Sequence, residues 1–114
     1  MLTSGDVVDL DLGMPHGREA GFRHPAVVVT AQRVLDAQPN VVHVVPLTSR
    51  IRGITSEVEF EPDAHNGLDR ASAAQCQHIR AVDVGRVHGL SGNIGAAALS
   101  QVRELLGLIL DIAE

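Results

Sequence analysis

Two short segments hold the side chains best suited to act on a phosphate group. Arg23-His24-Pro25 leads into one valine-rich run, and Thr48-Ser49-Arg50 follows the end of another. Proline fixes φ and lacks an N–H, so Pro25 suits the first position of a strand and restricts His24 to extended conformations. We therefore expect the guanidinium of Arg23 to be held at the entrance of a strand.

The two segments meet at one rim of a sheet if their strands are antiparallel neighbours, because one strand then begins where the other ends. An arginine gives a phosphate a bidentate, charged contact, and a hydroxyl adds a directed hydrogen bond. On the residues alone an alternative stays open. Arg23 would then be a solvated loop arginine, and Thr48 an ordinary β-branched strand residue.

The elements that must position these residues are short strands followed by one helix. Alternating or continuous apolar patterns predict the strands, and a helical spacing of Leu99, Val102, Leu106 and Ile109 predicts a helix over residues 96–112. One or two helical turns are expected at 31–37, and a glycine-rich loop at 13–24. The predicted strands are 5–12, 25–31, 41–48, 57–61 and 72–82. This pattern favours a mainly β fold, a small antiparallel barrel or half-barrel with a C-terminal helix.

Length and composition predict a single domain over residues 1–114, with 45% apolar residues for an aliphatic core. No apolar run approaches the ~18 residues of a membrane span, and the N-terminus lacks the pattern of a signal peptide. A lone cysteine and no membrane segment make the cytoplasm the expected compartment. The formal net charge of −5 makes the whole chain a poor binder of polyanions, so any nucleic-acid contact needs a local arginine cluster.

Other chemistries find little support in the sequence. It has no glycine-rich phosphate motif and no His-Glu-x-x-His, and its six histidines are scattered, so we predict no metal and no cofactor. Cys76 lies among small residues in a predicted strand. We expect a buried structural cysteine, with a reactive thiol as the alternative.

Four blocks, taken in order, resemble the MazF/PemK toxins of bacterial toxin–antitoxin systems. They are the opening strand at 5–12, the segment 17–29 with Arg23-His24-Pro25, the threonine-bearing strand at 44–49, and the strand at 74–80. The resemblance covers nearly the whole chain. It implies a CcdB/PemK-type, SH3-like barrel of five to seven antiparallel strands that forms a homodimer.

The same resemblance implies a metal-independent endoribonuclease that cuts single-stranded RNA at short motifs. The substrate's 2′-hydroxyl would attack the adjacent phosphate, leaving a 2′,3′-cyclic phosphate and a 5′-hydroxyl. By position, Arg23 would stabilise charge on the phosphorane and Thr48 would hydrogen-bond the scissile phosphate. The residues expected to line the RNA groove are Glu19, Phe22, His24, Ser49, Arg50 and Gln77. Phe22 is placed to stack on a base, and His24 would be the group that titrates near neutrality.

A toxin of this family also implies a MazE-like antitoxin whose tail blocks the RNA groove. The terminal helix is a candidate for part of the dimer surface, unless all of its apolar face packs on its own sheet. Two rival functions remain open. A CcdB-like protein would bind and poison DNA gyrase without cutting anything, and a degenerate relative would bind an antitoxin but be catalytically dead.

Overall fold

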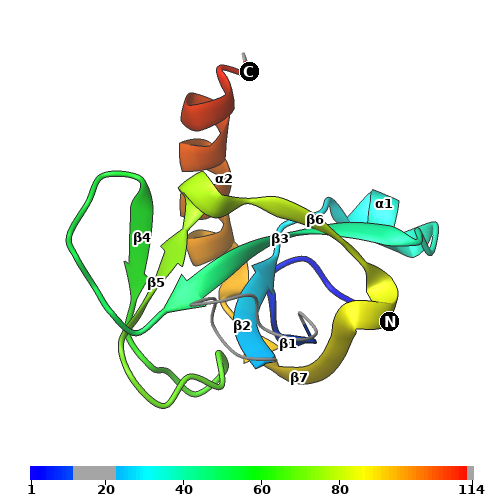
Figure 1. Ribbon diagram of the computed structural model, residues 1–114, viewed down its shortest axis with the longest axis horizontal. Coiled ribbons are helices and arrows are strands. Elements are labelled where there is room, and N and C mark those ends of the chain that lie inside the picture. Colours follow the sequence, from blue (N-terminus) through cyan, green and yellow to red (C-terminus); the bar gives the residue numbers. More distant parts are fainter. Residues whose placement is uncertain (12–22, 113–114) are drawn as a thin grey trace, which may run out of the picture.

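The computed structural model describes residues 1–11 and 23–112, which form a bent antiparallel sheet with a long helix packed against it (Figure 1). In chain order the elements are β1 (Asp6–Asp11), β2 (Arg23–Val28), α1 (Gln32–Asp36), β3 (Val41–Thr48), β4 (Glu57–Phe60), β5 (Ser72–Gln75), η1 (Cys76–His78), β6 (Arg80–Asp83), η2 (Val84–Arg86), β7 (Val87–Asn93) and α2 (Gly95–Leu110). The turns η1 and η2 are short 3₁₀ helices.

The strands pair in the order β4-β5-β3-β2-β1-β7, and β6 pairs with the first half of β3. Among the described residues, the end strands β4 and β7 do not pair with each other. The loop after β4 reaches β7 instead, where the Asn93 N–H donates to the His65 carbonyl at 2.9 Å. The seven strands and the terminal helix confirm the predicted fold class, with the sheet left open as a half-barrel.

The segment 72–82 is not the single strand that the sequence analysis predicts. Leu47 of β3 pairs with Ala74, and Val44 pairs with Arg80, so a step of three residues along β3 corresponds to a step of six along the neighbouring segment. The turn η1 takes up the three extra residues and turns the buried Cys76 into the core. Alternation therefore stops at η1. The sequence does not predict β7 either, because its glycines and polar residues give no alternating pattern.

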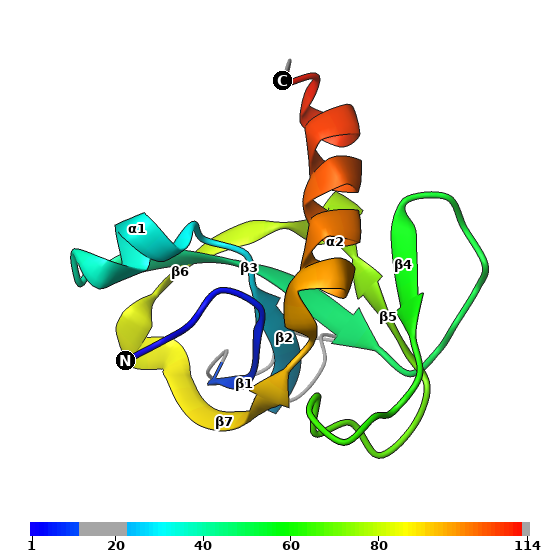
Figure 2. The ribbon, with the colours of Figure 1, turned by 180° about the vertical axis from the view of Figure 1, so that it is seen from behind.

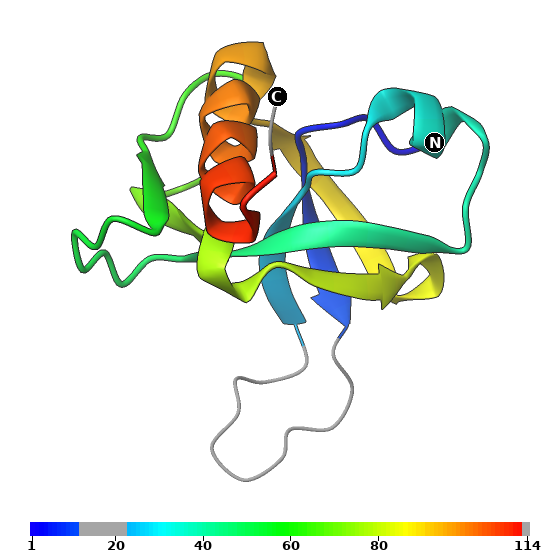
Figure 3. The same cartoon turned by 90° about the horizontal axis from the view of Figure 1, so that it is seen from above.

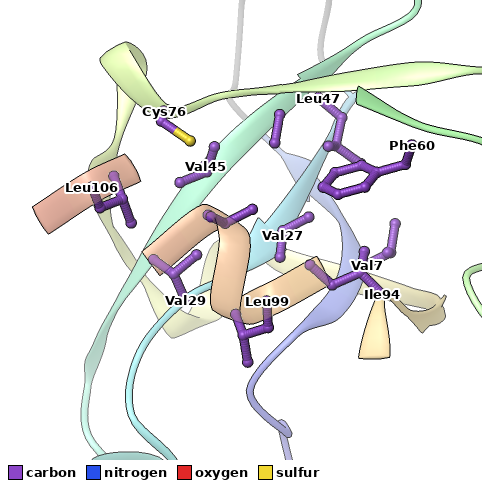
Figure 4. Close-up of a cluster of buried hydrophobic side chains, with 12 residues drawn as sticks. Val7, Val27, Val29, Val45, Leu47, Phe60, Cys76, Ile94, Leu99 and Leu106 are labelled. Atoms are coloured by element: carbon purple, nitrogen blue, oxygen red, sulfur yellow. The ribbon is translucent and has the colours of Figure 1, made fainter. Parts of the chain in front are cut away.

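Two aliphatic clusters fill the space on either side of the central strands. One lies between the sheet and α2, and Phe60 is its aromatic member (Figure 4). The other lies on the opposite side of β1, β2 and β3 and includes Leu35 of α1. Successive residues of β1 alternate between the clusters, with Val7 in the first and Val8 in the second, as a strand buried on both faces requires.

Helix α2 crosses the sheet in front of β2 and β3 in the view of Figure 2 and buries Leu99, Val102 and Leu106. The Arg103 guanidinium ties it to the end of β2 by donating to the Val29 carbonyl at 3.2 Å. Its last turn and the residues after it expose their apolar side chains, namely Leu108, Ile109, Leu110 and Ile112. One part of the apolar face of α2 thus packs on its own sheet, and the C-terminal part is exposed on the surface. Within residues 1–11 and 23–112, no helix has the length and apolarity to cross a bilayer.

Candidate active site at the rim of β2 and β3

The strands β2 and β3 are antiparallel neighbours, which is the condition for Arg23 and Thr48 to meet at one rim of the sheet. Val27 lies opposite Val45, and Ala26 opposite Pro46. Arg23 opens β2 and Thr48 closes β3, so both lie at the same rim of the sheet. In Figure 3 the end of β1 and the start of β2 point away from the side on which α1 and α2 lie.

The register arranges the rim residues in rows across β1, β2 and β3. The row Val7, Val27 and Val45 belongs to the core beneath α2. Two residues nearer the rim, Asp9 lies opposite Pro25, and continuing the register puts Leu47 in the same row. Two residues further out again, Asp11 lies opposite Arg23, and the same register puts Ser49 beside them. Since alternate rows share a face, Arg23 and Ser49 face the same side as Asp9.

His24 belongs to the intervening row, with Leu10 opposite it and Thr48 beside it on the continued register. It is half-buried, and burial lowers the pKa of its imidazole, although a hydrogen bond to the Leu47 backbone and the charge of Asp9 act in the opposite direction. Burial disfavours the charged form. The ring is therefore uncharged at neutral pH.

Thr48 is held in a defined turn at the end of β3. Its Oγ1 accepts a hydrogen bond from the Arg50 N–H at 3.1 Å, which is a hydroxyl turn of the kind that fixes loop entrances. The hydroxyl proton remains able to donate to a phosphate oxygen. Thr48 is partly buried, whereas Arg23, Ser49 and Arg50 are exposed and accessible to a ligand.

A cavity of about 390 Å³, called the rim cavity below, opens beside Thr48. It is bounded by β1, β2 and β3 and by the loop between β4 and β5, and its lining includes Asp9, Pro25, Leu47, Thr48, Ser49 and Arg70. Neither Asp9 nor Arg70 is predicted as a site residue from the sequence. The alternation of β1 could have indicated Asp9, because it shares a face with Val7. Nothing in the sequence pattern points to Arg70, which lies in a loop.

Gln77 lies elsewhere in the fold. Ala73 is opposite Thr48, and Gln77 follows four residues later, in η1. Its Nε2 donates to Glu57 Oε2 at 2.8 Å, and the nearly inaccessible Glu57 carboxylate also accepts from Arg52 at 3.2 Å. The structure therefore joins Gln77 to Glu57 and does not bring it to the row of Arg23. Glu19 and Phe22 lie outside the described residues.

Two of the other candidate chemistries can be examined in the structure. Cys76 is fully buried, and burial raises the pKa of its thiol to about 11, so it carries a proton at neutral pH and fits the structural expectation. In the part of the chain that the structure describes, no three His, Cys, Asp or Glu side chains gather as metal ligands would.

Comparisons with known proteins agree with this architecture. The family model described as PemK-like, MazF-like toxin of type II toxin–antitoxin system matches residues 3–110. Endoribonuclease MazF9 of Mycobacterium tuberculosis (strain ATCC 25618 / H37Rv) is 32% identical over 116 residues, covering 98% of each chain. Two Deinococcus radiodurans structures, of MazF (Form-I) and of MazE-MazF (Form-II), each have a TM-score of 0.75, with 27% and 28% identity over 96% of both chains. The chain thus belongs to the family of PemK-like and MazF-like toxins of type II toxin–antitoxin systems.

Proposed function

We propose that this chain is a toxin endoribonuclease that cuts single-stranded RNA without a metal ion. The proposal combines the family assignment with one observation, the β2–β3 register that brings Arg23 and Thr48 to one rim. The permanent cation of Arg23 at this rim, and the partly buried hydroxyl of Thr48 that lines the rim cavity, suit a phosphodiester.

The reaction uses a nucleophile supplied by the substrate. The 2′-oxygen forms a bond to the adjacent phosphorus, the bond from phosphorus to the 5′-oxygen breaks, and one proton moves from the 2′-hydroxyl to the leaving 5′-oxygen through a base and an acid. The products are a 2′,3′-cyclic phosphate and a 5′-hydroxyl. Because the nucleophile is internal, positioning and charge stabilisation supply much of the acceleration.

We assign Arg23 to the charge that develops on the phosphorane, because arginine holds its proton too tightly to serve as a base at neutral pH. Thr48 donates its hydroxyl to a non-bridging oxygen and fixes the phosphate. The uncharged imidazole of His24, beside Thr48 in the register, is able to accept the 2′-hydroxyl proton. Ser49 and Arg50 contact the RNA strand next to the scissile phosphate.

The partners follow from the same assignment. We propose a MazE-like antitoxin that covers the rim, since one of the similar solved structures is described as MazE-MazF. We also propose a homodimer whose interface includes the exposed end of α2, where Leu108, Leu110 and Ile112 line a cavity of about 720 Å³ with Val34. Such a toxin acts where messenger RNA is translated, in the cytoplasm.

The test incubates the purified protein with a long single-stranded RNA in EDTA and maps the new ends. The proposal expects cleavage at a short motif, with 5′ ends that polynucleotide kinase can label without prior phosphatase treatment. If the protein leaves the RNA intact and instead inhibits supercoiling by DNA gyrase, the gyrase-poison function replaces this one. Absence of both activities from a folded, antitoxin-binding protein identifies a catalytically dead relative.

A further inference from the structure

The rim cavity continues the face that carries Arg23. Pro25 and Leu47, in the row two residues inward from Arg23, form an apolar part of its lining. Asp9 lies at one end of this row, on β1, while Arg70 reaches the cavity from the loop between β4 and β5. A nucleotide whose phosphate lies against Arg23 and Thr48 therefore has a cavity next to it. The volume of about 390 Å³ lies at the small end of ordinary ligand sites, ~300–1,000 Å³.

Asp9 presents a fixed acceptor to this cavity. It lies within a paired strand, between Pro25 of β2 and Gly89 of β7, and is partly buried. Within residues 1–11 and 23–112, no hydrogen bond or ion pair engages its carboxylate, whose charge acts on His24. An ionised carboxylate is an acceptor only, with two oxygens side by side. Asp9 is thus suited to a ligand edge that offers adjacent donors.

Arg70 presents donors to the same cavity. Its Nε lies 3.7 Å from Asp69 Oδ1, and both side chains are largely exposed, at 71% and 90%. A surface pair of this kind contributes little, so the guanidinium can turn towards a bound ligand at small cost. The cavity therefore combines a carboxylate acceptor, a guanidinium donor and the apolar side chains of Pro25 and Leu47.

We propose that the rim cavity binds a guanine base of the RNA, next to the phosphate that is cut. This inference rests on the proposed endoribonuclease function. The Watson–Crick edge of guanine offers N1–H and N2–H₂ side by side to the Asp9 carboxylate. Its O6 and N7 accept from the Arg70 guanidinium, which is a common pairing of arginine with guanine. The ring lies over Pro25 and Leu47, and single-stranded RNA permits this access because its bases can be splayed out.

The other bases fit this arrangement less well. Uracil has one donor, N3–H, between two carbonyl oxygens that a carboxylate repels. Adenine and cytosine each place an acceptor nitrogen beside their amino group. A site that hydrogen-bonds two adjacent donors rejects bases that cannot supply both, because its polar groups are then left unpaired. Asp9 should therefore determine specificity rather than perform the chemistry.

The experiment uses the full-length protein and short RNAs that carry its own cleavage motif. Each base of the motif is replaced in turn, and the required guanine is replaced by inosine, which lacks the 2-amino group, or by 7-deazaguanosine, which lacks N7. The variants are Asp9→Asn and Arg70→Gln. The controls Asp36→Asn and Arg33→Gln change charge on α1, at the opposite rim.

The proposal expects one guanine in the motif to be required. Inosine removes one of the two donors to the Asp9 carboxylate, and one hydrogen bond to a charged group contributes about 1.5–3 kcal/mol, so kcat/KM of the unmodified protein should fall by roughly 10- to 150-fold. The same replacement should have little effect on Asp9→Asn, and 7-deazaguanosine should have little effect on Arg70→Gln. The controls should behave like the unmodified protein.

Three outcomes would overturn this inference and leave the nuclease in place. They are a cleavage motif that requires no guanine, an inosine effect that persists in Asp9→Asn, and an Asp9→Asn variant that loses kcat on every RNA without any change of motif. Complete absence of RNA cleavage by the unmodified protein would instead refute the proposed function itself. The two failures can therefore be told apart.

Discussion

Ala26 of β2 lies directly opposite Pro46 of β3, and this pairing determines which side chains meet at the rim. Counting outward from it, His24 falls beside Thr48, while Arg23 falls beside Ser49 on the face of the rim cavity.

Replacing Arg23 by alanine should reduce RNA cleavage by about 10²- to 10³-fold in kcat, as loss of one donor to a developing charge does in other enzymes. Arg23 is exposed, so thermal unfolding should not change. Arg33→Ala, an exposed arginine on α1, is the matched control and should cut normally. Cleavage by Arg23→Ala at the normal rate would show that the site lies elsewhere.

Thr48→Val keeps the shape of the side chain and removes its hydroxyl. A hydrogen bond to a charged group contributes about 1.5–3 kcal/mol, so kcat/KM should fall by roughly 10- to 150-fold. Thr48→Ser keeps the hydroxyl, together with the bond from the Arg50 N–H, and should restore most of the activity. Equal activity in the valine and serine variants would exclude a role for the hydroxyl.

His24 should make the stability depend on pH. Its pKa in the folded protein lies below the ordinary 6.5, so the unfolded chain binds a proton more readily between these two values. The free energy of unfolding should therefore be constant above about pH 6.5 and fall as pH drops through that window. His24→Gln should remove this component, while the exposed His78→Gln should not. Denaturant titrations at several pH values measure the difference.

If His24 also accepts the proton of the 2′-hydroxyl, the rate of cleavage should follow the same titration. The rate should fall below neutrality as the ring becomes charged, and His24→Ala should flatten that part of the profile. A profile that is unchanged in His24→Ala would leave His24 with a structural role alone.

Glu57 should contribute to stability as an anion. Burial raises the pKa of its carboxyl, but hydrogen bonds from Gln77, Arg52 and Gln75 outweigh this and lower the pKa below its ordinary value of 4.5. Its contribution is therefore present above pH 4.5 and is lost as pH falls through the folded-state pKa. Glu57→Gln should cost about 1–3 kcal/mol at neutral pH. The exposed Glu59→Gln on the same strand should cost much less, and equal costs would contradict the role of this network.

The sequence predicts the strands that position the site. It does not predict the places where the pairing between neighbouring strands shifts register. Pro25 and the valine runs are enough to predict β2 and β3, and their antiparallel pairing brings Arg23 and Thr48 to one rim. The turn η1 could not be predicted, because it depends on where the chain leaves its pairing with β3 at the end of β5 and pairs with β3 again in β6. The rim cavity could not be predicted for a similar reason, since Asp9 and Arg70 are 61 residues apart in the sequence and come together only in the fold.

The most direct test of the central claim removes the nucleophile that the mechanism assigns to the substrate. An RNA that carries the cleavage motif is synthesised with a single 2′-deoxy nucleotide immediately 5′ of the scissile phosphate, and its cleavage in EDTA is compared with that of the all-ribose strand. The account predicts that the all-ribose RNA is cut to a 2′,3′-cyclic phosphate and a 5′-hydroxyl, while the deoxy RNA stays intact and competes for binding. Cleavage of the deoxy RNA at the same bond would contradict it.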